Sequence, residues 1–152
     1  MVLCPDGLTS PGLQPLDVSN DVTFDTIKAV LVDLFSVLPD EFVHLGGDEV
    51  DTGCWERTEH IAAWMNRSGL TPDGAYGHFV QRTQAIAHSL GKTAIVWDEI
   101  WNHFGTSLNR SSTVINTRFN PNQAPERVMC VANATGHGYR VVRSENIHWC
   151  GG

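Results

Sequence analysis

The stretch EFVHLGGDEV, residues 41–50, joins a short apolar run to a Gly-Gly pair and then to two adjacent carboxylates. FVHL, residues 42–45, is predicted to form a short buried strand. The two glycines permit an unusual turn after it, because glycine accepts backbone angles that other residues avoid. Asp48 and Glu49 then stand just past the strand, where side chains project into a pocket and not into a core. By itself the stretch is compatible with a functional site at the end of a strand, with a solvated loop charge, or with a helix N-cap.

Helix and strand patterns alternate along the rest of the chain. The predicted helices cover residues 25–38, about 58–67, about 73–90 with Gly91 as a cap, and about 125–134. The further predicted strands are TAIVW, TVIN and YRVVR, at residues 93–97, 113–116 and 139–143, with a loop of about 15 residues between the first two. None of the strands shows the polar alternation of a half-exposed sheet. This order is typical of parallel strands that are covered by helices.

The positions of the polar residues favour a barrel over an open, doubly wound sheet. No GxGxxG or GxxxxGK[ST] motif follows any strand, which argues against the nucleotide-binding folds. Acidic residues instead follow two strand ends: Asp48, Glu49 and Asp51 after the first strand, Asp98 and Glu99 after the second. In a (β/α)8 barrel the carboxyl ends of the strands build the active site. We therefore predict an α/β fold that is part of a TIM barrel, since four strands make half of one.

The composition is that of one globular domain. The chain has 152 residues, of which 41% are hydrophobic and 18% charged. Its net charge of −7 and its lack of Lys and Arg clusters argue against nucleic acid or an anionic membrane as a partner. No apolar run approaches the roughly 20 residues of a membrane span. We expect a single incomplete domain, residues 1–152, that begins with a loop-rich segment, residues 1–22.

Cysteines and glycosylation sequons bear on the cellular compartment. The four cysteines, Cys4, Cys54, Cys130 and Cys150, fit neither a CxxC zinc pattern nor a small disulfide scaffold. Asn-x-Ser/Thr sequons occur three times, at Asn66, Asn109 and Asn133. Three sequons in so short a chain favour the secretory pathway, with a lysosomal or secreted protein. The chain shows no signal peptide, so we expect it to be an internal piece of a longer protein.

Two motifs resemble those of the β-N-acetylhexosaminidase family of glycoside hydrolases. HLGGDEVDTGCW, residues 44–55, resembles the H-x-G-G-D-E signature of the family, and LGKTAIVWDEI, residues 90–100, resembles its V-W-x-E strand. The resemblance runs from about residue 4 to residue 143 and is strongest over residues 42–101. It implies the central part of a catalytic (β/α)8 barrel, about strands 4 to 7. It also implies release of terminal N-acetylglucosamine or N-acetylgalactosamine from glycans, with retention and without a metal or organic cofactor.

The resemblance assigns different roles to the two adjacent carboxylates. In the family the 2-acetamido oxygen of the sugar itself attacks the anomeric carbon. Glu49 would protonate the leaving oxygen and then activate water. Asp48 would accept a hydrogen bond from the acetamido N–H and so orient that group. A carboxylic acid beside a second carboxylate and aromatic walls holds its proton more tightly, as a general acid needs. Trp55 and Trp97 are the candidates for those walls.

The resemblance also assigns roles to further residues, some of which have an alternative role. Trp97 matches the tryptophan that walls the acetamido pocket, the alternative being a core aromatic. Glu99 matches a carboxylate of the same motif and either supports the structure or contacts the substrate. His44 is expected to be a buried residue behind the acidic pair. Asp51 either holds the acidic loop or is a solvated charge.

The sequence also departs from the family pattern. Arg118 stands where the family often has a second pocket tryptophan, and Cys150 stands where it has a tyrosine for the acetamido carbonyl. Much of the substrate cradle is therefore missing. The resemblance further implies a disulfide between Cys4 and Cys54, the alternative being two free buried thiols.

Two other functions stay open at this point. The missing cradle is compatible with a catalytically inactive remnant that binds sugars or a partner. A metal-dependent enzyme would use Asp48, Glu49, Asp51 and His44 as ligands of Mg²⁺ or a transition metal. Half a barrel would also expose two sheet edges, which favours a homo-oligomer or another association through these edges.

Overall fold

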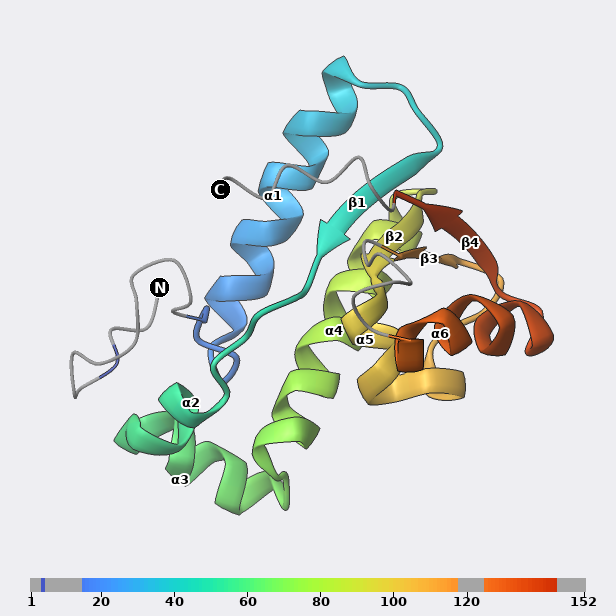
Figure 1. Cartoon of the computed structure of the whole chain (residues 1–152). Coiled ribbons are helices and arrows are strands. Elements are labelled where there is room, and N and C mark those ends of the chain that lie inside the picture. The colour runs from blue at the N-terminus through green and yellow to red at the C-terminus, as the bar shows by residue number, and fades with distance from the viewer. Residues whose placement is uncertain (1–3, 5–14, 118–124, 145–152) are drawn as a thin grey trace, which may run out of the picture. The chain divides into compact units, whose positions relative to one another are not determined.

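The computed structural model describes residue 4, residues 15–117 and residues 125–144, and the side chains of 125–130 lie outside the description. The chain divides into two compact units (Figure 1). Unit 1 comprises Met1–Pro39 and Glu49–Ile86, and unit 2 comprises Asp40–Asp48 and Ala87–Gly152.

Unit 2 is built on a sheet of four parallel strands in the order β1-β2-β3-β4. The strands are β1 (Phe42–Gly46), β2 (Thr93–Trp97), β3 (Thr113–Thr117) and β4 (Arg140–Arg143). Helices α5 (Asp98–Phe104) and α6 (Pro125–Gly136) pack against them. The predicted parallel α/β architecture is confirmed, and it is the arrangement expected for part of a (β/α)8 barrel.

The two faces of this sheet differ in their side chains. One face carries buried apolar residues, among them Val43 of β1 and Val96 of β2. On the other face the register aligns His44 with Ile95, and Trp97 with Asn116. Side chains alternate between the two faces of a strand, so His44, Trp97 and Asn116 share one face. The sheet therefore places polar and aromatic groups from three strands together near their carboxyl ends.

Unit 1 consists of helices and the segment that precedes them. The helices are α1 (Asp21–Val37), α2 (Gly53–Arg57), α3 (Glu59–Ser68) and most of α4 (Pro72–Ser89). Phe24, Trp55 and Ile61 are fully buried and form part of its core. Arg82 of α4 lies 3.7 Å above the Phe24 ring and donates to the Asp21 carboxylate at 2.7 Å. These contacts tie α1 to α4.

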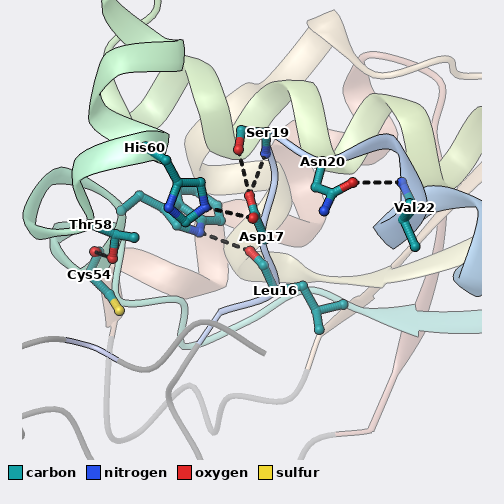
Figure 2. A network of polar contacts seen from close by, with 9 residues as sticks. Leu16, Asp17, Ser19, Asn20, Val22, Cys54, Thr58 and His60 are labelled. Carbon is teal, nitrogen blue, oxygen red and sulfur yellow. Dashed lines mark hydrogen bonds and ion pairs between the residues drawn. The ribbon is translucent and has the colours of Figure 1, made fainter.

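A polar network fixes the segment before α1 (Figure 2). The Asp17 carboxylate accepts hydrogen bonds from the amide and hydroxyl of Ser19, at 3.0 and 2.7 Å, and contacts His60 of α3 at 2.8 Å. Asn20 accepts from the Val22 N–H and caps α1. Because of this cap, α1 begins at Asp21, before the apolar periodicity starts. The last two residues of the loop-rich segment expected over 1–22 are therefore helical.

The remaining differences concern short elements. Helix α2, which has five residues, was not expected, and α5 with a 3-10 turn at Gly105–Ser107 occupies most of the loop expected after β2. Helix α4 ends at Ser89, within one residue of the predicted end, and the predicted cap Gly91 follows with a left-handed φ of +74°. No helix in the described ranges is long and apolar enough to cross a membrane.

Candidate active site

The backbone after β1 turns away sharply from the direction of the strand. His44 pairs with Ile95 and Gly46 with Val96, so Leu45 is one residue too many and forms a bulge. Gly46 and Gly47 then have φ values of +68° and +96°. These angles explain the Gly-Gly pair, because side chains with a Cβ rarely adopt them. The turn delivers the chain to Asp48 and Glu49.

Glu49 itself has a left-handed backbone, with φ at +54°. For a non-glycine residue this conformation costs roughly 1–2 kcal/mol and is concentrated at functional sites. The turn is also packed against α5, since a Cβ at Gly47 would lie 2.9 Å from Cδ1 of the buried Ile100 in that helix. Both constraints act on the residues that flank Asp48. Asp48 is the last residue of its segment in unit 2, and Glu49 opens the second segment of unit 1.

His44 is held from three sides within unit 2. Its ring lies 4.4 Å from the Trp97 ring, its Nδ1 accepts the Gly46 N–H at 3.0 Å, and its Nε2 lies 3.3 Å from the Asn116 amide. The expectation of a buried histidine is nevertheless wrong: the residue is exposed. The reason is that β1 is an edge strand and His44 lies on the face opposite Val43, which is buried. Partial burial of the ring lowers the pKa of His44 from its ordinary 6.5, and the Asp48 carboxylate opposes this with a smaller rise.

The end of β2 carries the second predicted group of residues. Trp97 is half-buried and lies against His44, and it stands at the N-cap position of α5. Asp98 and Glu99 occupy the first turn of α5, where a carboxylate is favoured by the helix dipole. Asp98 is 1% exposed, whereas Glu99 is half-buried. Trp97 is thus placed on the face of the sheet that carries His44, as a wall of a pocket would be.

Asn116 and Ser144 lie at this site and were missed by the sequence analysis. Asn116 is buried in β3 and faces His44, and the Ser144 hydroxyl just after β4 lies 3.0 Å from its amide oxygen. A polar residue inside the apolar strand TVIN was the one available signal for Asn116. Ser144 gave no signal, because its place depends on the register between β3 and β4.

Comparison with known proteins identifies the family. Residues 6–149 match the catalytic domain of glycosyl hydrolase family 20. The chain belongs to this family. It is 40% identical to beta-hexosaminidase 3 of Arabidopsis thaliana over 136 residues, which cover 90% of the chain and 24% of that protein. It is 35% identical to beta-hexosaminidase 1 of the same plant, with the same coverage. The family 20 chain thus spans about a quarter of the length of these relatives.

Solved structures of the family agree with the fold. The β-N-acetylhexosaminidase of Bacteroides fragilis matches with a TM-score of 0.70 and 25% identity, over 85% of this chain and 25% of that one. The GH20 exo β-N-acetylglucosaminidase of Vibrio harveyi, solved in complex with N-acetylglucosamine, matches with a TM-score of 0.66 and 26% identity, over 83% and 18%.

The loop after the acidic pair belongs to unit 1 of this family 20 chain. Asp51 accepts a hydrogen bond from Arg57 at 3.1 Å, so it takes part in holding the loop to α2. The expectation that Trp55 walls the pocket is wrong. Its side chain is 1% exposed and its Nε1–H donates to the Leu16 carbonyl at 3.0 Å, because the residue fills the core under the preceding segment. The disulfide between Cys4 and Cys54 is present, with 5.2 Å between the Cα atoms.

The other predicted positions have mixed outcomes. Asn66, Asn109 and Asn133 are all exposed, as a glycosylated asparagine must be. Arg118 and Cys150 lie outside the described residues. Within the part of the chain that the structure describes, no group of three or more His, Cys, Asp or Glu side chains is placed to hold a metal ion. The metal-dependent alternative therefore has no ligand set among those residues.

Proposed function

We propose that this chain carries the acid and the orienting carboxylate of a retaining β-N-acetylhexosaminidase. The observation that carries the proposal is the turn after β1, where the adjacent carboxylates follow two glycines with positive φ in a chain of family 20. On a regular extended strand, neighbouring side chains point to opposite sides. The left-handed backbone at Glu49 breaks this alternation, so both carboxylates can serve one sugar.

The proposed reaction has two steps and needs no covalent bond to the protein. First, the acetamido oxygen of the sugar bonds to the anomeric carbon while the glycosidic bond breaks, and Glu49 gives its proton to the leaving oxygen. Asp48 accepts the acetamido N–H and stabilises the positive charge that develops on this group. Next, water attacks the anomeric carbon, Glu49 takes a proton from it, and the bond to the acetamido oxygen breaks. Two displacements at one carbon give net retention.

Neighbouring residues would shape the pocket for the acetamido group. We assign Trp97 as its apolar wall, because the ring is half-buried on the sheet face that carries His44. Glu99, in the first turn of α5, is assigned as a supporting or substrate-contacting carboxylate. His44 and Asp51 contact no substrate in this proposal. They hold the backbone on either side of the acidic pair, His44 by its contact with Gly46 and Asp51 by its contact with Arg57.

The proposed substrates are glycans that end in N-acetylglucosamine or N-acetylgalactosamine. The relatives named beta-hexosaminidase support this class, as does the complex of the Vibrio harveyi enzyme with N-acetylglucosamine. The alternative of a non-catalytic sugar- or partner-binding module gains no support from these matches, since both carboxylates stand in the matched region. We further propose a lysosomal or secreted protein with glycans at the three sequons. The disulfide and the exposure of all three asparagines support that proposal.

A single incomplete catalytic domain is proposed to complete its barrel by association. β1 and β4 form the two edges of the described sheet, and Phe42 and Val142 on them are 42% and 45% exposed. Unpaired strand edges bind other strands, so either the complementary barrel strands or a second copy of the chain would cover them.

The test is hydrolysis by a chimera in which residues 6–149 replace the matched segment of beta-hexosaminidase 3. We expect release of the fluorophore from a fluorogenic N-acetyl-β-glucosaminide and no release from the matching glucoside. Glu49→Gln should lower the rate about 10²–10⁴-fold, the usual loss for a general acid. A leaving group acidic enough to depart unprotonated should recover part of it. Asp48→Asn should also slow the reaction, because the acetamido group is no longer oriented.

An exposed aspartate supplies the control for these variants. Asp33→Asn, at an exposed position of α1, makes the same chemical change at a residue with no proposed role and should leave the rate unaltered. A Glu49→Gln chimera as fast as the unmodified one would remove Glu49 from the acid role. Efficient turnover of the glucoside would exclude participation of the acetamido group.

A further inference from the structure

Side chains at the carboxyl ends of β1, β3 and β4 form one continuous chain of polar contacts. It begins at the Gly46 N–H, which donates to His44 Nδ1 at 3.0 Å. The other ring nitrogen, Nε2, lies 3.3 Å from the side-chain nitrogen Nδ2 of Asn116, and the oxygen and nitrogen of that amide exchange places if the group is rotated. The side-chain oxygen Oδ1 of Asn116 lies 3.0 Å from the Ser144 hydroxyl, which is also 3.0 Å from the Thr117 carbonyl. Beside this chain of contacts, Trp97 of β2 packs against the His44 ring.

Counting protons on His44 decides which end of the amide faces it. A side-chain amide can present either its oxygen or its NH₂ to a neighbour. If the Asn116 NH₂ faced Nε2, both nitrogens of His44 would have to accept a hydrogen bond. A neutral imidazole has one accepting nitrogen and one N–H, and a protonated imidazole has none that accepts. Only the amide oxygen therefore fits beside Nε2, which must carry the proton.

The contacts of the Ser144 hydroxyl are compatible with this orientation. The hydroxyl lies at 3.0 Å from both the Asn116 amide and the Thr117 carbonyl, and it has a single proton to donate. The Thr117 carbonyl has two lone pairs and also accepts the Ser144 N–H at 2.8 Å. With the NH₂ facing Ser144, the amide donates to the hydroxyl and the hydroxyl donates to the carbonyl. One rotation of the amide thus satisfies every group in the chain.

We propose that Asn116 and Ser144 hold His44 as the tautomer that carries its proton on Nε2. In this form Nδ1 accepts the Gly46 N–H and anchors the first residue after the β1 bulge. The turn to the acidic pair starts at that residue. Asn116 and Ser144 are accordingly positioning residues, which act through the His44 ring and contact no substrate.

The surroundings of His44 agree with a neutral ring in this role. Its pKa is lowered by partial burial, against the smaller effect of Asp48, the charged neighbour that bears on it. The catalytic meaning of the tautomer rests on the proposed function, because it matters only if Asp48 and Glu49 must be held in place. The tautomer itself can be read without any substrate.

The test uses the full 152-residue chain labelled with ¹⁵N in histidine and in glycine. Long-range ¹H–¹⁵N correlation spectra identify which ring nitrogen carries the proton, and a His44→Gln variant assigns the signal among the seven histidines. We expect the proton of His44 on Nε2. The Gly46 amide should exchange slowly with solvent.

Two substitutions of Asn116 distinguish the loss of its hydrogen-bond acceptor from the addition of a charge. Asn116→Leu removes the acceptor of Nε2–H, so the Nε2–H form should lose its preference and the Gly46 amide should exchange about fivefold faster, as for loss of one hydrogen bond. Asn116→Asp keeps an acceptor there and should retain the Nε2–H form. Asn102→Asp, at an exposed position of α5, adds the same charge outside the chain of contacts and should change neither readout.

Different outcomes count against different claims. A proton on Nδ1 of His44, or an Asn116→Leu variant with an unaltered Gly46 exchange rate, would overturn the positioning role. If Asn116→Leu fails to fold, Ser144→Ala provides the second variant, and it should weaken the Nε2–H preference in part. In the hydrolytic chimera Asn116→Leu should lower kcat more than it raises KM, with recovery in Asn116→Asp. An inactive unmodified chimera would contradict the proposed function and leave the tautomer result standing.

Discussion

At the scale of single residues, the two glycines of the turn are under different constraints. Both have positive φ, at +68° for Gly46 and +96° for Gly47. A Cβ on Gly46 would meet no atom within 4 Å, whereas one on Gly47 would overlap Ile100. At position 46, glycine is therefore required by the backbone angle alone. At position 47 it is required both by the backbone angle and by the packing of Ile100.

This difference predicts unequal costs of substitution by alanine. Gly46→Ala should lower the free energy of unfolding by roughly 1–2 kcal/mol, the cost of a Cβ in a left-handed backbone. Gly47→Ala should cost a further 1–3 kcal/mol or so, because Ile100 is fully buried and must move. Urea unfolding of the two variants measures the difference. If the two variants lose the same unfolding free energy, Ile100 moves aside at no cost and the packing constraint on Gly47 is disproved.

At the scale of elements, length decided what could be predicted from the sequence. The long helices and the four strands were predicted because each contains enough periodic or apolar residues to be recognised. Helix α2 has five residues and α5 has seven, which is too short for a helical period to stand out. The acidic pair and Trp97 were found from motifs beside strand ends. Asn116 was not, because its contact with His44 crosses β2 and depends on sheet register.

The contact between the segment before α1 and helix α3 should depend on pH. Burial raises the pKa of Asp17, but hydrogen bonds from the Ser19 hydroxyl, His60 and the Ser19 amide, with attraction by His60, lower it more, and the net result is a pKa below 3.8. A carboxyl with a lowered folded-state pKa stabilises the fold above its unfolded pKa. This stabilisation is lost as the pH falls through the folded-state pKa.

Asp17→Asn should therefore lower the free energy of unfolding at pH 7 by about 1.5–3 kcal/mol, the range for hydrogen bonds to a charged group. The difference from the unmodified chain should shrink as the pH falls below 3.8. Denaturant midpoints measured from pH 7 to acid test this. Asp33→Asn, at an exposed position of α1, should stay within about 0.5 kcal/mol of the parent. A gap between Asp17→Asn and the parent that persists in acid would argue against the charged Asp17 carboxylate as its source.

At the scale of the whole molecule, one covalent bond spans much of unit 1. The Cys4–Cys54 disulfide joins positions 50 residues apart, and both side chains are buried. Closing a loop of that length removes entropy from the unfolded chain that corresponds to about 4 kcal/mol. The bond also links the N-terminal segment to α2, which follows the acidic loop.

Removal of this bond should lower the stability of the chain strongly. The Cys4→Ala/Cys54→Ala double variant should lose up to about 4 kcal/mol of unfolding free energy. The unmodified chain in reductant should show a similar loss, and reductant should not affect the double variant. Peptide mapping without reduction should recover the two peptides linked. Free thiols at both positions would show that the bond does not form.

The left-handed backbone at Glu49 also has an evolutionary consequence. Asparagine and glycine adopt this conformation more readily than glutamate, so the residue that catalysis requires here is not the one that folding prefers. In a library randomised at this codon and sorted only for folded protein, we expect Asn and Gly to displace Glu over successive rounds. Sorting for hydrolysis should reverse the drift. The residue frequencies at position 49 would then show whether a population has been selected for folding alone or for hydrolysis as well.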